Sequence, residues 1–275
     1  MTAIAEAVAS GVLPGRLWMY SNYHCNLTCS YCLTESAPKV AKREISADTM
    51  VELATEAEHL GFTSLGVTGG EPFLLPYMSE TTTRMAEILP ILVLTNGTLF
   101  SGSRLEQARE FAGAPIALQI SLDSADPVAN DTMRGPENFR KVVEAIPALV
   151  ERGVRVRVAT TAEEVDDRDM ERLCALHREL GVSDEDHVVR PIVRRGRAVD
   201  SGLGVSADHA DLPPELTISA DGAFWSPFGP TVHGGKLDTD LLLSRTTSPL
   251  DRPASILLRL VQGRPPGDDA KLNIQ

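Results

Sequence analysis

The sequence lacks any segment that could cross a membrane and carries little positive charge. Its longest apolar run, 88–94, is interrupted by Pro90 and falls far short of the ~18 residues that a transmembrane helix needs. Lysine and arginine number 26 against 38 aspartates and glutamates, for a net charge of −12. Nucleic-acid phosphates and anionic lipids attract basic surfaces. The composition therefore argues against both as partners.

Cysteine is also scarce, with four residues in a chain of 275. That number is too small for a disulfide scaffold in a chain of this length. The first residues, 1–13, contain no lysine or arginine and fit neither a secretory signal nor a transit peptide. We therefore expect a reducing, cytoplasmic location.

What is present suits a globular protein with a full core. Apolar residues make up 43%, and glycine and proline, at 21 and 18 residues, stay well below the level of low-complexity chains. A chain of this length buries most of its apolar surface when it folds. The composition therefore predicts one large domain or two small ones.

Apolar runs alternate with helical patterns as far as residue 196. The predicted strands cover 17–21, 62–68, 91–95, 116–122, 154–160 and 188–193. The predicted helices cover 47–60, 79–89, a segment opened by Ser103 with a capping box to Glu106, 137–152 and 168–180. Parallel strands need such crossovers, so the pattern predicts an α/β fold with a parallel sheet. An open doubly wound sheet and a partial barrel both fit it.

The alternation stops after residue 200. A linker or loop is expected first, then a hairpin with its turn at Asp221-Gly222, and last a helix near 253–261. The predicted division is an N-terminal extension over 1–15, the main α/β domain over 16–200, a small α+β extension over 201–262 and a flexible tail over 263–275.

Three of the four cysteines, Cys25, Cys29 and Cys32, fall within eight residues. This spacing would put them on one face of a helix, as small core residues. It also fits zinc, with His24 or a distant residue as fourth ligand, and an iron–sulfur cluster, whose usual ligands are thiolates. The polar neighbours disfavour the helix, and the absence of a second cysteine pair disfavours zinc. Three thiolates on a four-iron cluster would leave one iron open to another ligand.

The cysteine spacing, with Tyr31 before the last cysteine, resembles the radical S-adenosylmethionine (SAM) superfamily. The segment Thr68-Gly69-Gly70-Glu71-Pro72 comes about 40 residues later, directly after the second predicted strand. It is similar to the family segment that lines the amino group of SAM. Glycine permits close backbone approach, and a carboxylate such as Glu71 suits an ammonium group.

Further residues of the resemblance follow the third, fourth and sixth predicted strands: Asn96, Ser121, Asp123, Arg134, Ile192 and Val193. The resemblance implies that Ser121 and Arg134 hold the carboxylate of SAM, for which a guanidinium is well suited. It also implies that the backbone at 192–193 meets the adenine. All of these positions follow carboxyl ends of strands, where active sites of α/β barrels assemble.

The resemblance covers about residues 16–196 and implies a partial (β/α)6, TIM-like barrel. It implies that Cys25, Cys29 and Cys32 hold one [4Fe-4S] cluster and that SAM fills the open iron site. Reductive cleavage of SAM would then give a 5′-deoxyadenosyl radical that abstracts a hydrogen atom from a substrate carbon. Such an enzyme is an oxidoreductase or a lyase and needs an electron donor such as flavodoxin or ferredoxin.

The segment 216–238 resembles the hairpin region of the SPASM and twitch subgroups of that superfamily. Those subgroups carry cysteines there for auxiliary clusters, whereas this chain has Ser226 and Pro227 at the corresponding place. The resemblance therefore implies a remnant without a cluster that could act as a wall or lid for the substrate.

The substrate stays open at this stage. SPASM and twitch relatives often modify ribosomal peptides, although we do not expect residues 1–15, before the predicted barrel, to form a leader-binding domain. A small metabolite such as a nucleoside, sugar or amino acid is the alternative, and a non-catalytic metal-binding protein is a third hypothesis. Candidate substrate contacts are Arg194, Arg195 and Trp225, each of which also has an ordinary structural explanation.

Overall fold

A computed structural model describes residues 2–163 and 167–263. Its main feature is a sheet that contains, in the described residues, nine strands in the order β11-β8-β7-β1-β2-β3-β4-β5-β6. The first six strands run parallel to one another in chain order: β1 (Arg16–Tyr20), β2 (Ser64–Thr68), β3 (Ile91–Thr95), β4 (Ile116–Ser121), β5 (Arg155–Ala162) and β6 (His187–Pro191). A doubly wound sheet would reverse its order partway. The sequential order instead defines a partial (β/α)6 barrel.

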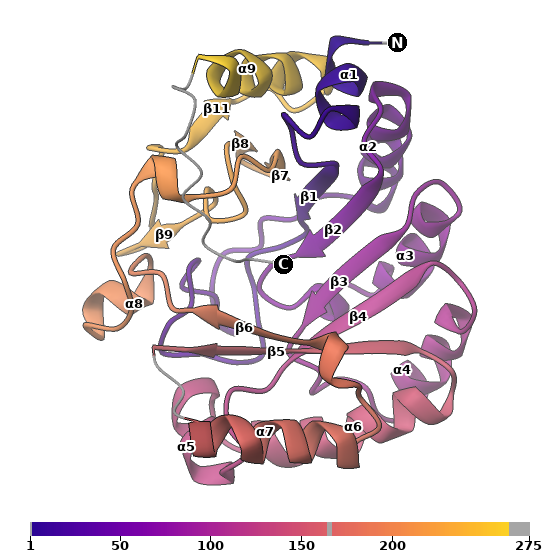
Figure 1. The fold of residues 1–275 in the computed structure, drawn as a ribbon, viewed down its shortest axis with the longest axis vertical. Coiled ribbons are helices and arrows are strands. Elements are labelled where there is room, and N and C mark those ends of the chain that lie inside the picture. The colour runs from indigo at the N-terminus through magenta and orange to yellow at the C-terminus, as the bar shows by residue number, and fades with distance from the viewer. Residues whose placement is uncertain (1, 164–166, 264–275) are drawn as a thin grey trace.

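Helices between these strands lie along the outer side of the curved sheet (Figure 1). They are α2 (Ala47–Leu60), α3 (Met78–Ala86), α4 (Gly102–Gln107), α6 (Asn138–Glu151) and α7 (Asp167–Glu179). In α2 the predicted cap is confirmed, because the Ser46 hydroxyl accepts from the amide of Thr49 and Gly61 ends the helix in a left-handed conformation. The apolar faces of these helices and the outer side chains of the strands form the core.

The capping box predicted at Ser103 is wrong. Helix α4 begins at Gly102, its N-cap residue is Ser101, and no side chain bonds its first turn. The Glu106 carboxylate pairs instead with Arg109 at 2.9 Å and Arg152 at 2.8 Å, so it does not reach back to the cap. The segment then tightens into the 3-10 turn η2 (Ala108–Phe111).

An aromatic side chain from β1 lines the inside of the barrel. Trp18 is buried and lies flat against Gly66 of β2, where an added Cβ would come within 2.4 Å of the indole ring. Any larger residue at 66 would displace the indole ring, which forms part of the cavity wall.

Two shorter helices and two 3-10 turns complete the barrel region. The turn η1 (Pro72–Leu74) follows β2, η3 (Asp184–Asp186) precedes β6, α5 (Pro127–Arg134) follows β4, and α8 (Arg197–Asp200) follows β6. Helix α5 begins at Pro127 with the Asp126 carboxylate as its cap. Its last residue is Arg134, so the helix delivers this side chain to the carboxyl end of the sheet.

The C-terminal residues extend the barrel sheet. Strand β7 (Thr217–Ser219) pairs parallel to β1, and β8 (Gly222–Phe224) and β11 (Leu242–Ser244) continue from it antiparallel. The hairpin turn lies at Ala220–Asp221, one residue before the predicted position, because Ser219 pairs with Gly222. The remaining elements are η4 (His209–Asp211), the small pair β9 (Val232–His233) and β10 (Lys236–Leu237), and α9 (Asp251–Gln262).

The N-terminal extension forms helix α1 (Ala3–Ala9), capped by the Thr2 hydroxyl. It lies near α9 (Figure 1). Apart from Gly263, the predicted tail lies outside the described residues. None of the helices in the described parts of the chain is long and apolar enough to pass through a bilayer.

Candidate active site

The three clustered cysteines lie in the long loop between β1 and α2. Cys25 is buried, and Cys29 and Cys32 are partly exposed; all three are free thiols that line one cavity. The segment is not helical, which excludes the explanation as a helix face. Burial and the neighbouring Glu71 raise the pKa of the Cys25 thiol to about 12. A metal centre that stabilises thiolates would reverse this effect.

The cysteine loop is held in place by residues that follow β6, the last strand of the barrel. The Arg197 guanidinium donates to the backbone carbonyls of Cys29 and, at 3.0 Å, Ser36, and its backbone amide donates to the Cys32 carbonyl. At Gly196, where φ is +57°, an added Cβ would lie 2.2 Å from the carbonyl oxygen of Leu33. The turn after β6 therefore holds the cysteine loop in place, a role that the sequence did not predict for Arg197.

The number and type of ligands at the cavity bear on whether it would hold a cluster or a single zinc ion. Burial and, to a lesser extent, the neighbouring thiols raise the pKa of Cys25 and Cys29, so the three thiols lie close together, and the fourth cysteine, Cys174, does not line the cavity with them. Structural zinc takes four protein ligands, whereas a four-iron cluster held by three thiolates keeps one iron open. The donor set therefore fits an iron–sulfur cluster better than structural zinc.

The Gly69-Gly70 turn packs directly onto this loop. An added Cβ at Gly70 would lie 2.2 Å from the carbonyl oxygen of His24, and one at Gly69 would lie 2.5 Å from the Asn22 side chain. The Gly70 amide donates to the Asn22 carbonyl at 2.8 Å. Both glycines line the cavity. They bring the backbone close to the thiols, where a bound ammonium group could be met by carbonyls.

Glu71 lies behind this turn. Its carboxylate is fully buried and accepts from the amides of Phe73 (3.0 Å) and Asn96 (2.7 Å) and the Thr95 hydroxyl (2.8 Å). Glu71 does not line the cavity, and burial raises its pKa. The geometry therefore gives it the task of joining the glycine turn to the end of β3, in place of the contact with the amino group implied by the resemblance.

Asn96 connects the third strand to the cysteine loop. Its amide nitrogen donates to the Asn26 side chain at 2.9 Å and approaches the Cys25 sulfur at 3.7 Å. The backbone amide of Leu27 also donates to that sulfur, at 3.3 Å. Donors to sulfur stabilise a thiolate and tune a cluster that it ligates. Asn96 lines the cavity, as its candidate role requires.

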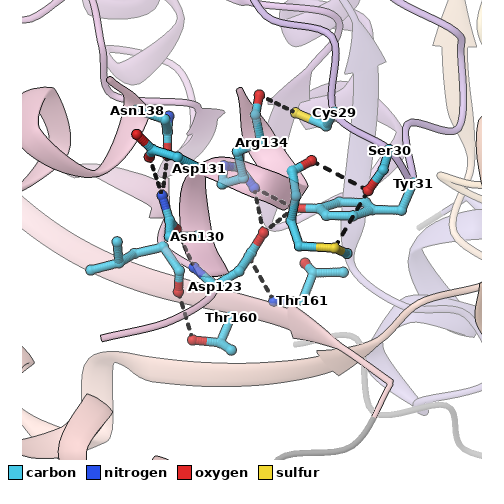
Figure 2. Close-up of polar contacts among 12 residues, drawn as sticks. Cys29, Ser30, Tyr31, Asp123, Asn130, Asp131, Arg134, Asn138, Thr160 and Thr161 are labelled. Carbon is cyan, nitrogen blue, oxygen red and sulfur yellow. Dashed lines mark hydrogen bonds and ion pairs between the residues drawn. The ribbon is translucent and has the colours of Figure 1, made fainter. Parts of the chain in front are cut away.

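A buried group of three side chains joins the cysteine loop to β4 and α5 (Figure 2). Arg134 donates to the Asp123 carboxylate at 3.2 Å and to the Tyr31 hydroxyl, which itself donates to Asp123. The Arg134 and Asp123 side chains are 6% and 3% exposed. Burial opposes the Arg134 charge, but Tyr31 and Asp123 outweigh it and raise its pKa well above the ordinary value. Arg134 therefore stays charged, and it lines the cavity.

The loop after β4 fixes the position of Asp123. Its second carboxylate oxygen accepts from the Thr161 amide of β5 at 3.0 Å, and its backbone amide donates to the Asn130 side chain of α5 at 3.0 Å. Asn130 is anchored in turn by Asn138, at 2.9 Å (Figure 2). Two strands and two helices thus hold the aspartate before any ligand arrives.

The cavity between these elements has a volume of about 240 Å³. The structure brings most of the predicted cofactor-binding residues to its wall: Tyr31, Gly69, Gly70, Asn96, Ser121, Arg134, Ile192 and Val193. The Ile192 carbonyl already accepts from the Val205 amide at 2.9 Å. Arg190, Pro227 and Phe228 also line the cavity.

The three candidate substrate contacts lie elsewhere. Arg194 donates to the backbone carbonyls of Leu203 and Gly204, and Arg195 forms an ion pair with Asp240 at 2.7 Å. Trp225 is fully buried, with its indole nitrogen donating to the Leu212 carbonyl at 3.3 Å. None of the three lines the cavity. Trp225 directly follows β8 and belongs to the hydrophobic core.

The sequence matches the model of the Radical SAM superfamily over residues 19–176. This is more than half of the chain, and the chain belongs to that superfamily. The cofactors of the family are a [4Fe-4S] cluster and SAM, and the donor set of the cavity fits both.

Two curated relatives show the range of activities in the family. The antilisterial bacteriocin subtilosin biosynthesis protein AlbA of Bacillus subtilis is 30% identical over 161 residues, which cover 58% of this chain and 36% of AlbA. A probable GTP 3′,8-cyclase of Archaeoglobus fulgidus is 33% identical over 130 residues, which cover 47% of this chain and 43% of the cyclase. The chain thus matches less than half the length of either relative.

A solved structure of Streptococcus suis SuiB bound to its precursor peptide SuiA has a similar fold. The match has a TM-score of 0.59 and 19% sequence identity, and covers 76% of this chain and 46% of SuiB. At this identity the likeness concerns the fold, and it agrees with the partial barrel described above.

Proposed function

We propose that this protein cleaves SAM reductively and uses the resulting 5′-deoxyadenosyl radical to abstract a hydrogen atom from a substrate carbon. The single observation that carries the proposal is one cavity lined by three free cysteines, the Gly69-Gly70 turn and the buried, charged Arg134. A bound cluster supplies the electron for cleavage, and the protein supplies position and shielding.

The roles of the chain's own residues follow from their placement. Cys25, Cys29 and Cys32 would ligate three irons. The carbonyls of the glycine turn would receive the SAM amino group, and Arg134 its carboxylate, since one guanidinium nitrogen, Nε, is buried without a partner. Asp123 positions Arg134 without touching the ligand. The apolar Ile192 and Val193 would cover the adenine and help to exclude water.

For the substrate we favour a peptide. AlbA takes part in biosynthesis of a bacteriocin, and SuiB has been crystallised with a precursor peptide, which supports this assignment. The match to a GTP 3′,8-cyclase favours a small metabolite as the second candidate. A reduced flavodoxin or ferredoxin is the proposed electron donor, and the cytoplasm the proposed location.

The test is formation of 5′-deoxyadenosine. The protein is reconstituted anaerobically with iron and sulfide and given SAM and a strong reductant. We expect product from the wild type and from Cys174→Ala, whose thiol lies outside the cavity, and none from the Cys25→Ala/Cys29→Ala/Cys32→Ala variant. A wild type with a filled cluster that forms no 5′-deoxyadenosine under any substrate tested would contradict the proposal.

The same assay separates the two substrate classes. Peptides encoded beside the gene and a panel of nucleosides, sugars and amino acids are added in parallel. Faster 5′-deoxyadenosine formation with a peptide, together with a mass change in that peptide, supports the first candidate. Acceleration by a small molecule alone supports the second.

A further inference from the structure

Arg190 lies on the inner face of β6 and lines the cavity next to Thr161 of β5, its partner in the sheet register. Ile192, two residues further on, lines the same wall. Within residues 2–163 and 167–263, the Arg190 side chain makes no hydrogen bond or ion pair, and its Nε is buried without a partner. A guanidinium has five donors, so this wall offers donors that the protein itself leaves unused.

The nearest charges make the absence of a partner more costly. Arg157 and Arg16 repel the Arg190 guanidinium, and Glu215 is the carboxylate that attracts it. Glu215 already accepts from the Trp18 indole nitrogen at 2.7 Å. Burial and the two arginines lower the pKa of Arg190 to about 10, so it is still protonated at neutral pH.

The other two arginines are also poorly neutralised. The Nε atoms of Arg16 and Arg157 are buried without partners. Arg157 reaches Asp186 only at 3.6 Å, and Asp186 is already paired with Arg155 at 3.0 Å. Three guanidiniums from β1, β5 and β6 thus face too few carboxylates, and the interior at this wall carries excess positive charge.

A purely structural arginine in this chain looks different. Arg197 is satisfied by two backbone carbonyls, and Arg195 by Asp240 and Thr231. Arg190 has neither kind of partner although its Nε is buried, and leaving a buried donor unpaired destabilises a fold. Its position at the cavity wall offers a reason to keep it.

We propose that Arg190 binds an anionic group of the substrate, a carboxylate or a phosphate, and thereby selects acidic substrates. The inference rests on the proposed function, which gives the cavity a substrate beside SAM. Both groups present two oxygens that match the guanidinium fork. Arg16 and Arg157 do not line the cavity, and they contribute by adding positive potential behind Arg190.

The test is calorimetric titration of the cluster-loaded, SAM-bound protein with succinate, inorganic phosphate and the neutral analogue succinamide. SAM is present so that its own site is filled. We expect one or both anions to bind and succinamide not to bind. Arg190→Gln should weaken anion binding roughly 10- to 100-fold, the loss typical of a charged hydrogen-bonded pair. Arg190→Lys keeps the charge but not the two-pronged guanidinium, so its anion affinity should lie between those of the wild type and Arg190→Gln.

The matched control is Arg172→Gln, the same charge change at an exposed position on α7. It should bind anions as the wild type does. The melting temperature of Arg190→Gln should stay equal or rise, because a repelled, unpaired charge is removed; a structural arginine would lower it. Tighter succinate binding identifies a carboxylate substrate, and tighter phosphate binding a phosphorylated one.

Anion binding that is equal in wild type and Arg190→Gln, or no preference over succinamide, would overturn the inference. The two proposals fail separately. Arg190-dependent anion binding without 5′-deoxyadenosine formation would leave this site standing and sink the proposed function. SAM cleavage without Arg190-dependent binding would do the reverse.

Discussion

The two sides of the cavity satisfy their polar groups in opposite ways. On the cysteine side, Tyr31, Asp123 and Arg134 bond to one another, and the Arg134 Nε is the buried side-chain atom of the three without a partner. On the β6 side, Arg190 has no side-chain partner in the part of the chain that the structure describes. A preorganised site suits a ligand that is always the same, such as SAM. A site that depends on its ligand for neutralisation suits the part of the reaction that differs between family members.

The largest effect should come from removing a cysteine ligand. Cys25→Ala should abolish stable cluster assembly, because Cys25 is the buried thiol that receives both the Leu27 amide and the Asn96 side chain. Iron and acid-labile sulfide per chain are measured after anaerobic reconstitution. Cys174→Ala is the matched control and should keep the full amount. Full iron in Cys25→Ala would remove the basis for placing the cluster here.

A smaller effect, a loss of stability, should follow when the carboxylate that pairs with Arg134 on the cysteine side is removed. Asp123→Asn leaves the buried Arg134 guanidinium without a carboxylate, and breaking such a pair costs about 3–5 kcal/mol. Urea unfolding of the cluster-free protein measures the change in the free energy of unfolding. Asp126→Asn, three residues away, should cost little because asparagine also caps the start of α5. Equal losses in both variants would show that Asp123 has no special role.

A buried histidine behind β6 should make the protein less stable at acid pH. His177 is fully buried behind β6 with both ring nitrogens unpartnered, and burial lowers its pKa from 6.5 to about 4. Between these values the unfolded chain takes up a proton that the folded chain does not. The free energy of unfolding should therefore fall as the pH falls through this window, by roughly 3 kcal/mol.

Urea unfolding at pH 7 and pH 5 measures the upper part of this window, roughly 2 kcal/mol of the change. His177→Leu should reduce this change and leave the part due to His187, whose pKa is also lowered by burial, whereas His59→Leu, at an exposed position on α2, should leave it unchanged. A dependence that is as steep in His177→Leu as in the wild type would assign the acid sensitivity to other groups.

The smallest effects should come from two aromatic residues of the C-terminal extension, one in the core and one in the cavity wall. Trp225→Phe removes one hydrogen bond, to the Leu212 carbonyl, and should cost about 1 kcal/mol of stability without changing SAM cleavage per folded molecule. Phe228→Ala, which alters the cavity wall, should instead change the rate at which a substrate stimulates cleavage. A change in cleavage with Trp225→Phe and none with Phe228→Ala would reverse the assignment.

The sequence predicted the strands and most of the helices well because their signals are local, whereas the choice of a barrel over a doubly wound sheet came from the family resemblance. Strong apolar runs mark β1 to β6, and caps such as Ser46 and Gly61 mark α2. Helix α5 was missed because it is short and mostly polar, with Val128 exposed. The pairing of β7 with β1 joins residues about 200 positions apart, and no local pattern encodes such a contact.

The site shows the same limit. The cysteines and glycines were found because backbone approach and thiol chemistry fix the residue type. Glu71 and Arg197 act through partners that only the tertiary structure reveals. Among the arginines after residue 189, the inward one could not be chosen, because the alternation of β6 depends on its register with β5. The register selects Arg190.

The most direct test of the account is an anaerobic crystal structure of the cluster-loaded protein with SAM. We predict that the SAM amino group lies at the Gly69-Gly70 turn, that its carboxylate lies at Arg134, and that Arg190 stays free for a second ligand. A SAM carboxylate bound to Arg190, or a metal centre that does not engage Cys25, Cys29 and Cys32 together, would contradict the division of the cavity described above.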